Sequence, residues 1–174
     1  MPFKEAILMA TSYSEYKLEI VDYIRKHFKP KSWVLDVGAG CGTYADYLKG
    51  YFKNIDAVEV FEPNIINFDL KKKYKCVYNV DIREFKFVFY DLIIMGDVLE
   101  HLTVEEAKKV LDYMLPRCKE IIVAVPYLMP QGIEEDNVYE IHKQDDLTPE
   151  IMEKRYPQLK CLYQNQWCGY YIKK

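Results

Sequence analysis

Few cysteines occur in this sequence, and their arrangement excludes two kinds of small stabilised domain. Five of the 174 residues are cysteine, which is an odd number, and no Cys-x-x-Cys pair occurs. A disulfide framework or a zinc knuckle would need paired spacings, so we expect reduced thiols in a cytoplasmic protein. The start, Met-Pro-Phe-Lys-Glu, lacks the apolar region of a secretory signal, and no stretch approaches the roughly 18 apolar residues of a membrane helix.

Positive charge is not in excess either. Lysine and arginine total 24, aspartate and glutamate total 27, and the formal net charge is −3. A protein that holds a phosphate backbone needs clustered basic residues, and the only dense basic stretch lies at residues 71–75. We therefore expect a small-molecule substrate rather than a nucleic acid or a membrane. The composition gives no indication of the oligomeric state.

Glycine is scarce too, which makes its one concentration informative. Three of the seven glycines are Gly38, Gly40 and Gly42, directly after the apolar run 33–37 and before a segment that suits a helix. Glycine permits sharp turns and close approach of a ligand, and the start of the helix offers free N–H groups. Dinucleotides and S-adenosylmethionine (SAM) both bind at such turns. The dinucleotide fingerprint G-x-G-x-x-G requires glycine where Thr43 stands, so the spacing favours SAM.

Acidic residues follow the next two predicted strands at positions that suit a nucleoside. Glu59 stands 21 residues after Gly38, in the apolar run 55–61. A carboxylate there can accept hydrogen bonds from both hydroxyls of a ribose, in proteins that bind NAD as in those that bind SAM. Asp81 follows the third predicted strand, residues 75–80. These positions indicate a nucleoside cofactor without choosing between the two.

Two motifs resemble those of the class I SAM-dependent methyltransferases. The pattern Asp-x-Gly-x-Gly-x-Gly at residues 36–42 resembles their motif I, and Asp-Leu-Ile-Ile-Met-Gly-Asp-Val-Leu-Glu-His-Leu at residues 91–102 closely resembles their fourth-strand motif. The resemblance covers roughly residues 32–126. It implies SAM as the cofactor, with Asp81 accepting from the adenine amino group and Ile82 covering the ring. The cofactor-binding residues that it implies are Asp36, Gly38, Ala39, Gly40, Gly42, Glu59, Val60, Phe61, Asp81, Ile82, Gly96, Asp97 and Leu99.

Strands alternate with helices along the chain, which predicts a parallel sheet with right-handed crossovers. Residues 88–95 and 120–125 are apolar enough for strands covered on both faces, and residues 103–115 predict a helix that begins with a capping box. The resemblance implies an α/β, doubly wound, mostly parallel sheet of seven strands. Their order is 3-2-1-4-5-7-6 with strand 7 antiparallel, in a Rossmann-like methyltransferase fold. We expect a single domain over residues 1–174.

The N-terminal helix and the segment 127–147 are predicted to form the substrate side. An amphipathic helix over residues 15–28, with Ser14 as its N-cap, belongs to an N-terminal helical segment, residues 1–30. Residues 127–147 form a loop too long for a simple connection, so we expect the loop to face the substrate. The chain is predicted to end in a hairpin that turns around Gly169.

Methyl transfer requires a nucleophile aligned with the activated methyl group, and a base can assist an oxygen or nitrogen nucleophile. His101 and His142 are the predicted bases, with Glu100 and Asp97 as weaker candidates, and Glu100 and Tyr139 are expected to contact the substrate. No large insertion follows the fourth or fifth strand. We therefore predict a small-molecule or sugar-type substrate.

Three other functions fit parts of the pattern. Asp97, Glu100, His101 and His142 resemble the Glu-x-x-Glu-His and later His of metal-dependent RNA 2′-O-methyltransferases of the small-RNA type, in which oxygen and imidazole ligands hold a divalent cation. The first position is aspartate here, no second histidine follows His142, and the net acidity disfavours RNA, so we prefer a general base and predict no metal. A catalytically inactive SAM-binding partner subunit is another alternative, and the presence of Glu59, Asp81 and His101 argues against it. An NAD oxidoreductase is disfavoured because no hydride-transfer constellation is present.

Overall fold

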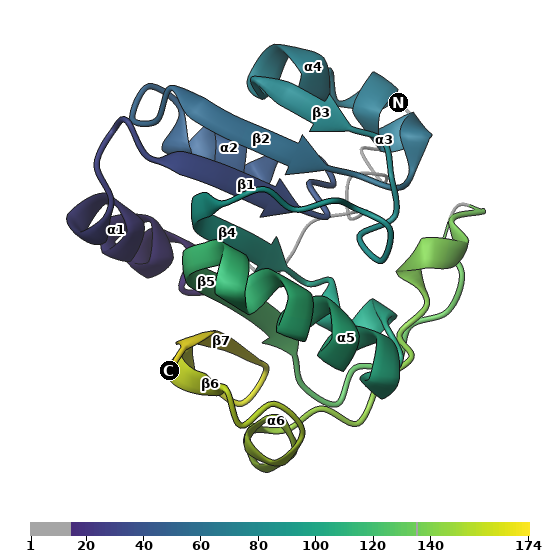
Figure 1. The fold of residues 1–174 in the computed structure, drawn as a ribbon. Coiled ribbons are helices and arrows are strands. Elements are labelled where there is room, and N and C mark those ends of the chain that lie inside the picture. Colours follow the sequence, from purple (N-terminus) through teal and green to yellow (C-terminus); the bar gives the residue numbers. More distant parts are fainter. Residues whose placement is uncertain (1–14, 135) are drawn as a thin grey trace, which may run out of the picture.

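The computed structural model describes residues 15–134 and 136–174, which form a seven-stranded sheet with helices packed against it (Figure 1). The strand order is β3-β2-β1-β4-β5-β7-β6. Neighbouring strands from β3 to β5 are parallel, and β7 is antiparallel to both β5 and β6, as predicted. The strands are β1 (Trp33–Val37), β2 (Asn54–Val58), β3 (Cys76–Tyr78), β4 (Tyr90–Gly96), β5 (Cys118–Pro126), β6 (Leu159–Gln164) and β7 (Cys168–Lys173).

Helices cover both faces of the sheet. Buried side chains of α1 and α2 pack on one face, and those of α5 and α6 pack on the other (Figure 1). The helices are α1 (Lys17–His27), α2 (Thr43–Leu48), α3 (Glu62–Asn67), α4 (Leu70–Lys73), α5 (Val104–Met114) and α6 (Pro149–Arg155), with 3₁₀ turns η1 (Leu99–His101), η2 (Leu115–Arg117) and η3 (Val138–Glu140).

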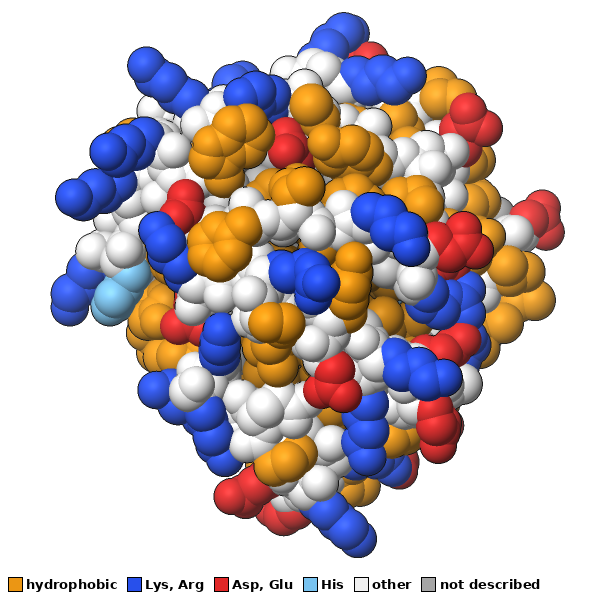
Figure 2. All heavy atoms as spheres, viewed as in Figure 1, with side chains coloured by type: hydrophobic (Ala, Val, Ile, Leu, Met, Phe, Trp, Pro, Cys, Tyr) orange, Lys and Arg blue, Asp and Glu red, His pale blue; other side chains and the backbone are white. Residues whose placement is uncertain are grey.

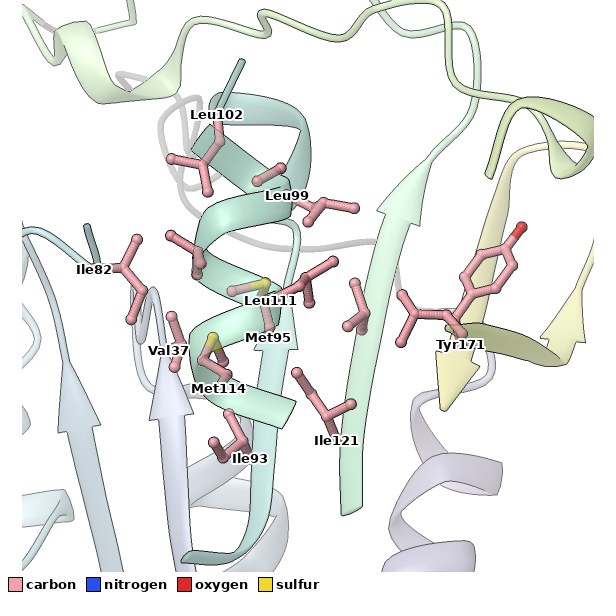
Figure 3. Close-up of a cluster of buried hydrophobic side chains, with 14 of the residues drawn as sticks. Val37, Ile82, Ile93, Met95, Leu99, Leu102, Leu111, Met114, Ile121 and Tyr171 are labelled. Atoms are coloured by element: carbon pink, nitrogen blue, oxygen red, sulfur yellow. The ribbon is translucent and has the colours of Figure 1, made fainter. Parts of the chain in front are cut away.

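Strand β4 lies at the centre of the sheet and is buried from both sides. Leu92 and Ile94 belong to the apolar cluster on the α1 and α2 face, whereas Ile93 and Met95 belong to the cluster on the α5 face. Side chains alternate between the faces of a strand, so a strand covered by helices on both sides is apolar throughout. Figure 3 shows Met95 near Leu111 and Ile93 near Met114, both residues of α5. This packing fixes the end of β4, from which the candidate site is built.

Local signals in the sequence account for the starts of two helices. The Thr103 hydroxyl accepts a hydrogen bond from the Glu106 N–H at 3.2 Å, and the Glu106 carboxylate accepts from the Thr103 N–H at 2.8 Å. This is the predicted capping box of α5. Thr148 caps α6 by accepting from the Ile151 N–H at 3.2 Å. The N-cap predicted at Ser14 lies outside the described residues.

Several predicted boundaries differ from the structure, and two of them bear on the site or on packing. The strand predicted at residues 55–61 begins at Asn54 and ends at Val58, and Glu59 and Val60, which follow it, line the candidate site. The hairpin predicted to turn around Gly169 turns at residues 165–167, and Gly169 lies inside β7. Its lack of a side chain serves packing and not the turn.

Replacing Gly169 with alanine is expected to destabilise the fold. A Cβ there would lie 1.9 Å from the Tyr127 hydroxyl oxygen and 2.8 Å from Cε2 of Tyr171, two buried rings. Overpacking of this kind costs about 1–3 kcal/mol, which lowers the Tm of a chain of this size by roughly 2–12 °C. Thermal unfolding measures the effect. Gly132→Ala is the control, because nothing lies within 4 Å of its Cβ. Equal Tm values for the two variants would contradict the packing role of Gly169.

The surface mixes charges of both signs. Figure 2 shows lysine and arginine side chains interspersed with aspartate and glutamate over the face viewed. Over residues 15–134 and 136–174, no helix has both the length and the apolar character that a membrane crossing requires. The single domain and the cytoplasmic location stay predictions.

Candidate functional site

A cavity of about 660 Å³ opens at the carboxyl ends of β1, β2 and β4, and residues of the segment 129–143 form its opposite wall. Strand β1 lies between β2 and β4 at the point where the strand order reverses, which is where open α/β sheets bind their ligands. In Figure 1 the segment that carries η3 lies beyond these strand ends. The volume falls within the range of about 300–1,000 Å³ that is typical of small-molecule sites.

Most of the residues predicted from the sequence line this cavity. They are Asp36, Gly38, Ala39, Gly40, Glu59, Val60, Asp81, Ile82, Gly96, Asp97, Glu100, His101, Tyr139 and His142. The other three lie behind the wall. Gly42 precedes α2, Phe61 contributes a backbone N–H to Glu59, and Leu99 is fully buried in the core. The residues predicted for the cofactor and those predicted for catalysis and the substrate thus line one cavity. The three remaining residues lie behind the residues that line it.

The glycine turn has the backbone that only glycine adopts readily. Gly38, Gly40 and Gly42 have φ angles of 68°, 52° and 82°, in the left-handed region. A Cβ on Gly38 would lie 2.3 Å from Cγ2 of Val98, so the turn also packs closely against the segment after β4. A Cβ on Gly42 would lie 2.8 Å from Cδ of Lys73, on the side away from the cavity. Gly38 and Gly40 therefore line the floor of the cavity, whereas Gly42 allows Lys73 of α4 to pack against the turn.

Glu59 ties the glycine turn to the end of β2. Its side chain is buried, with one carboxylate oxygen accepting from the Gly40 N–H at 2.7 Å and the other from the Phe61 N–H at 2.8 Å. Burial raises the pKa of this carboxyl, and the bonds from Phe61 and Gly40 oppose the rise. The Asn64 side chain and the Val60 N–H also hydrogen-bond to this carboxylate and lower its pKa. The side chain thus braces the turn and places a carboxylate at the cavity wall.

Asp36 lies buried at the floor of the cavity. The Tyr74 hydroxyl donates to its carboxylate at 2.5 Å. Burial raises the pKa of Asp36 to about 7, against the lowering effects of the Tyr74 bond and of the Lys17 ammonium. Both partners come from outside the glycine turn, Lys17 from α1 and Tyr74 from the residue after α4. This carboxyl therefore links the floor to elements on one face of the sheet.

Asp81 is held in a network at the rim. The Arg83 guanidinium donates to both of its oxygens, at 2.8 Å and 2.5 Å, and also to Glu106 at 2.5 Å. Hydrogen bonds from Arg83 hold the pKa of Asp81 below its usual range. Glu106 in turn lies 3.5 Å from the Lys143 ammonium. Three segments that are distant in sequence thus meet at one edge of the cavity.

Glu100, His101 and His142 form a compact cluster where the η1 turn, which follows β4, meets the segment 129–143. One potential ligand atom from each of the three lies within 4.8 Å of the others. The Glu100 side chain is fully buried, and neither of its carboxylate oxygens has a hydrogen-bond partner among the described residues. Burial, together with the neighbouring Asp97, raises the pKa of Glu100 well above its ordinary value. A buried carboxyl without partners is costly to the fold and calls for a functional explanation.

The two histidine rings are oriented by backbone carbonyls. Nδ1 of His101 lies 3.3 Å from the Ile141 carbonyl oxygen, and Nδ1 of His142 lies 2.6 Å from that of Met129. A carbonyl can only accept, so Nδ1 carries the proton in each ring and Nε2 presents a lone pair. Burial, and then the neighbouring His142, lowers the pKa of His101 to about 4. Near neutral pH the His101 ring is therefore uncharged.

Several residues of the wall were not predicted. Arg83, Gln131 and Glu140 line the cavity. The Gln131 amide donates to the Glu140 carbonyl at 3.0 Å and to its carboxylate at 3.2 Å. Both residues lie in the predicted substrate-side loop, residues 127–147, which has no periodicity that would show which side chains point inward. Arg83 stands two residues after Asp81, a spacing too common to be a signal.

Comparisons with known proteins establish the fold. No family model and no curated protein sequence matches the chain. A SAM-dependent methyltransferase from Clostridium acetobutylicum matches with a TM-score of 0.70 at 15% identity, over 94% of this chain and 92% of the other. SAM-bound CalS10, an amino pentose methyltransferase from Micromonospora echinaspora, matches at 0.63 and 13% identity over 94% and 92% of the two chains. The methyltransferase domain of bacterial CtHen1-CN matches at 0.65 and 16% over 90% and 95%. The chain therefore has the Rossmann-like fold of the SAM-dependent methyltransferases.

Proposed function

We propose that this protein is a SAM-dependent methyltransferase that acts on an oxygen or nitrogen nucleophile of a small-molecule or sugar-type substrate. The observation that carries the proposal is the buried carboxylate of Glu59 at the end of β2, held by N–H groups of Gly40 and Phe61. A carboxylate at the end of the second strand is the group that accepts from the paired hydroxyls of a ribose in nucleoside-binding sheets. The left-handed glycine turn beside it leaves room for the rest of a nucleoside cofactor.

The residues that would hold SAM lie along one wall of the cavity. Gly38 and Gly40 leave the backbone open to close approach, Glu59 would accept from the ribose, and Asp81 with Ile82 would contact the adenine. SAM supplies a methyl group already activated on a sulfonium, so the chain has mainly to align the acceptor and exclude water. The segment 129–143 faces this wall across the cavity and would contact the acceptor.

The charges around the cavity support an acceptor without phosphate groups. The basic residues of the wall are Arg83 and Lys143, which pair with Asp81 or Glu106. The acidic residues of the wall are Asp36, Glu59, Asp81, Asp97, Glu100, Glu134 and Glu140. Proteins that hold the phosphate backbone of a nucleic acid do so mainly with free lysine and arginine side chains. This balance favours a small uncharged or cationic molecule over RNA.

A second candidate function is a cation-dependent methyltransferase. It is favoured by the buried carboxylate of Glu100, whose two oxygens have no hydrogen-bond partner among the described residues. A divalent cation held by Glu100 and by Nε2 of His101 and His142 would satisfy both carboxylate oxygens that have no other described partner. Two imidazoles and a carboxylate suit a transition metal such as Mn²⁺ or Co²⁺, and ligating histidines usually donate their other N–H to a carbonyl, as these rings do. Such a cation would lower the pKa of an acceptor hydroxyl.

His101, one of the two general bases predicted from the sequence, is less well supported in that role. A base acts best when its pKa lies near the working pH, and burial lowers the pKa of His101 to about 4. A neutral imidazole with a low pKa is instead a ready metal ligand, because protons compete weakly for it. The cation site is therefore our preferred role for this cluster, with a base as the alternative.

Calorimetry with SAM and with S-adenosylhomocysteine tests the proposed function. We expect both to bind with Kd values on the order of micromolar, or about −8 kcal/mol, while NAD and NADP give no heat. Binding of NAD without SAM would contradict the proposal. A metabolite screen scored by formation of S-adenosylhomocysteine then distinguishes an enzyme from an inactive SAM-binding subunit, which would bind the cofactor and turn over no acceptor.

A further inference from the structure

We infer that Gln144 is a positioning residue that holds η1 in place, so that Glu100 and His101 face His142. This inference rests on the cation site proposed above. Gln144 is buried and does not line the cavity, so it would touch neither cofactor nor acceptor. It stands two residues after His142, at the place where the substrate-side loop passes behind the η1 turn.

The side-chain amide of Gln144 joins two separate elements. Its Nε2 donates to the Leu99 carbonyl at 2.9 Å and to the Leu102 carbonyl at 3.0 Å, the residues on either side of Glu100 and His101. Its Oε1 accepts from the Tyr156 hydroxyl at 2.7 Å and from Arg155 at 3.3 Å. A glutamine amide has two donor hydrogens and two acceptor positions, and all four are used here.

This arrangement fixes the amide in one orientation. Turning it over would place Oε1 against the two carbonyl oxygens, with which it can form no hydrogen bond. The amide is therefore a rigid link from α6 to η1. Few other side chains could replace it, because both a double donor and a double acceptor are needed at the same length.

The backbone beside Gln144 strengthens the same link. The N–H groups of Lys143 and Gln144 both donate to the Glu100 carbonyl, at 2.8 Å and 3.1 Å. A 3₁₀ turn of three residues has little stability of its own, so these external bonds determine where its side chains point. Partners that orient metal ligands typically matter by 10–100-fold in metal affinity. Gln144 would act on the cation through the position of Glu100 and His101.

Titration of the full-length protein with Co²⁺, followed by its visible absorption, tests the inference. Gln144→Met keeps the length and loses every hydrogen bond of the amide. Gln144→Glu keeps the acceptor toward Tyr156 and Arg155 and loses the donors toward η1. We expect both variants to bind Co²⁺ at least about tenfold more weakly than wild type, with an altered spectrum.

Met152→Ala is the matched control for destabilisation. Met152 is buried in α6 and makes no hydrogen bond through its side chain to η1. The control should lower the Tm while the Co²⁺ affinity and spectrum stay those of wild type. Wild-type affinity and spectrum in both Gln144 variants would overturn this inference alone. A wild-type protein that gives no cobalt spectrum would overturn the cation site and this inference together, while SAM binding would still stand as a separate result.

Discussion

Mn²⁺ is expected to stabilise the wild-type protein and to leave Glu100→Gln unchanged. Glu100 is fully buried, and its carboxylate oxygens have no partner in the described part of the chain, so the cation would supply the missing interaction. At a free concentration of about 100 times Kd, binding adds about 2.7 kcal/mol to the free energy of unfolding, which raises the Tm by roughly 5–10 °C. A chelator should reverse the shift. Thermal unfolding with Mn²⁺, with chelator and with neither measures it.

The same experiment has a defined dependence on pH. Burial raises the pKa of Glu100 above its ordinary 4.5, so above that pH the unfolded chain releases a proton that the folded protein keeps. The contribution of this group to stability therefore falls as the pH rises from 4.5 toward its pKa in the folded protein. The cation displaces that proton, and its stabilising effect should be larger at pH 8 than at pH 6. Without cation, Glu100→Gln should be at least as stable as wild type at pH 8.

Glu134→Gln is the control for this prediction. Glu134 also lines the cavity, but it is exposed and lies outside the Glu100, His101 and His142 cluster. The control should keep the full response to Mn²⁺. An equal response in Glu100→Gln would place the cation elsewhere. If Mn²⁺ does not raise the Tm of the wild-type protein, the histidines would instead be general bases, as predicted from the sequence. Activity would then be insensitive to chelators.

Replacing Glu59 with alanine is expected to weaken SAM binding by about 2–3 kcal/mol, or roughly 30–150-fold. The carboxylate would make charge-assisted hydrogen bonds to two ribose hydroxyls, and the variant leaves those hydroxyls unpaired. The structure adds a second effect, because the Gly40 and Phe61 N–H groups lose their acceptor and the glycine turn loses its brace. Calorimetry measures the affinity, and thermal unfolding measures the loss of stability.

Glu62→Ala is the matched control for Glu59. It removes a carboxylate from the same connection, three residues later, but its side chain is exposed and lies outside the cavity wall. SAM affinity should stay at the wild-type value in this variant. Unchanged affinity in Glu59→Ala would remove Glu59 from the cofactor site, whatever happens to the Tm.

Features that depend on a few adjacent residues could be predicted from the sequence. The glycine turn follows from three glycines after an apolar strand, and the cap of α5 follows from Thr103 and Glu106. The strand order and the antiparallel β7 followed from the alternation of elements and from the family resemblance.

Features that depend on distant contacts could not be predicted. Gln144 contacts Leu99 from 45 positions away, and nothing in the neighbouring sequence distinguishes it from a surface glutamine. The lack of hydrogen-bond partners for the Glu100 carboxylate likewise depends on other segments of the chain, which bury it. The two roles predicted for His101, base and ligand, cannot be separated by spacing, because burial and the carbonyl at Nδ1 determine how strongly protons compete for the ring.

The position of β7 has a consequence for biosynthesis. In the order β5-β7-β6, the edge strand β6 reaches the sheet only through β7, which is the last strand to leave the ribosome. During synthesis β5 therefore presents an open hydrogen-bonding edge, and β6 emerges before any partner for it exists. Such unpaired strands are sites of mispairing with other chains. A nascent chain that stops before residue 168 would thus carry the glycine turn and Glu59 but remain prone to aggregation, because the sheet is complete only once β7 has been synthesised.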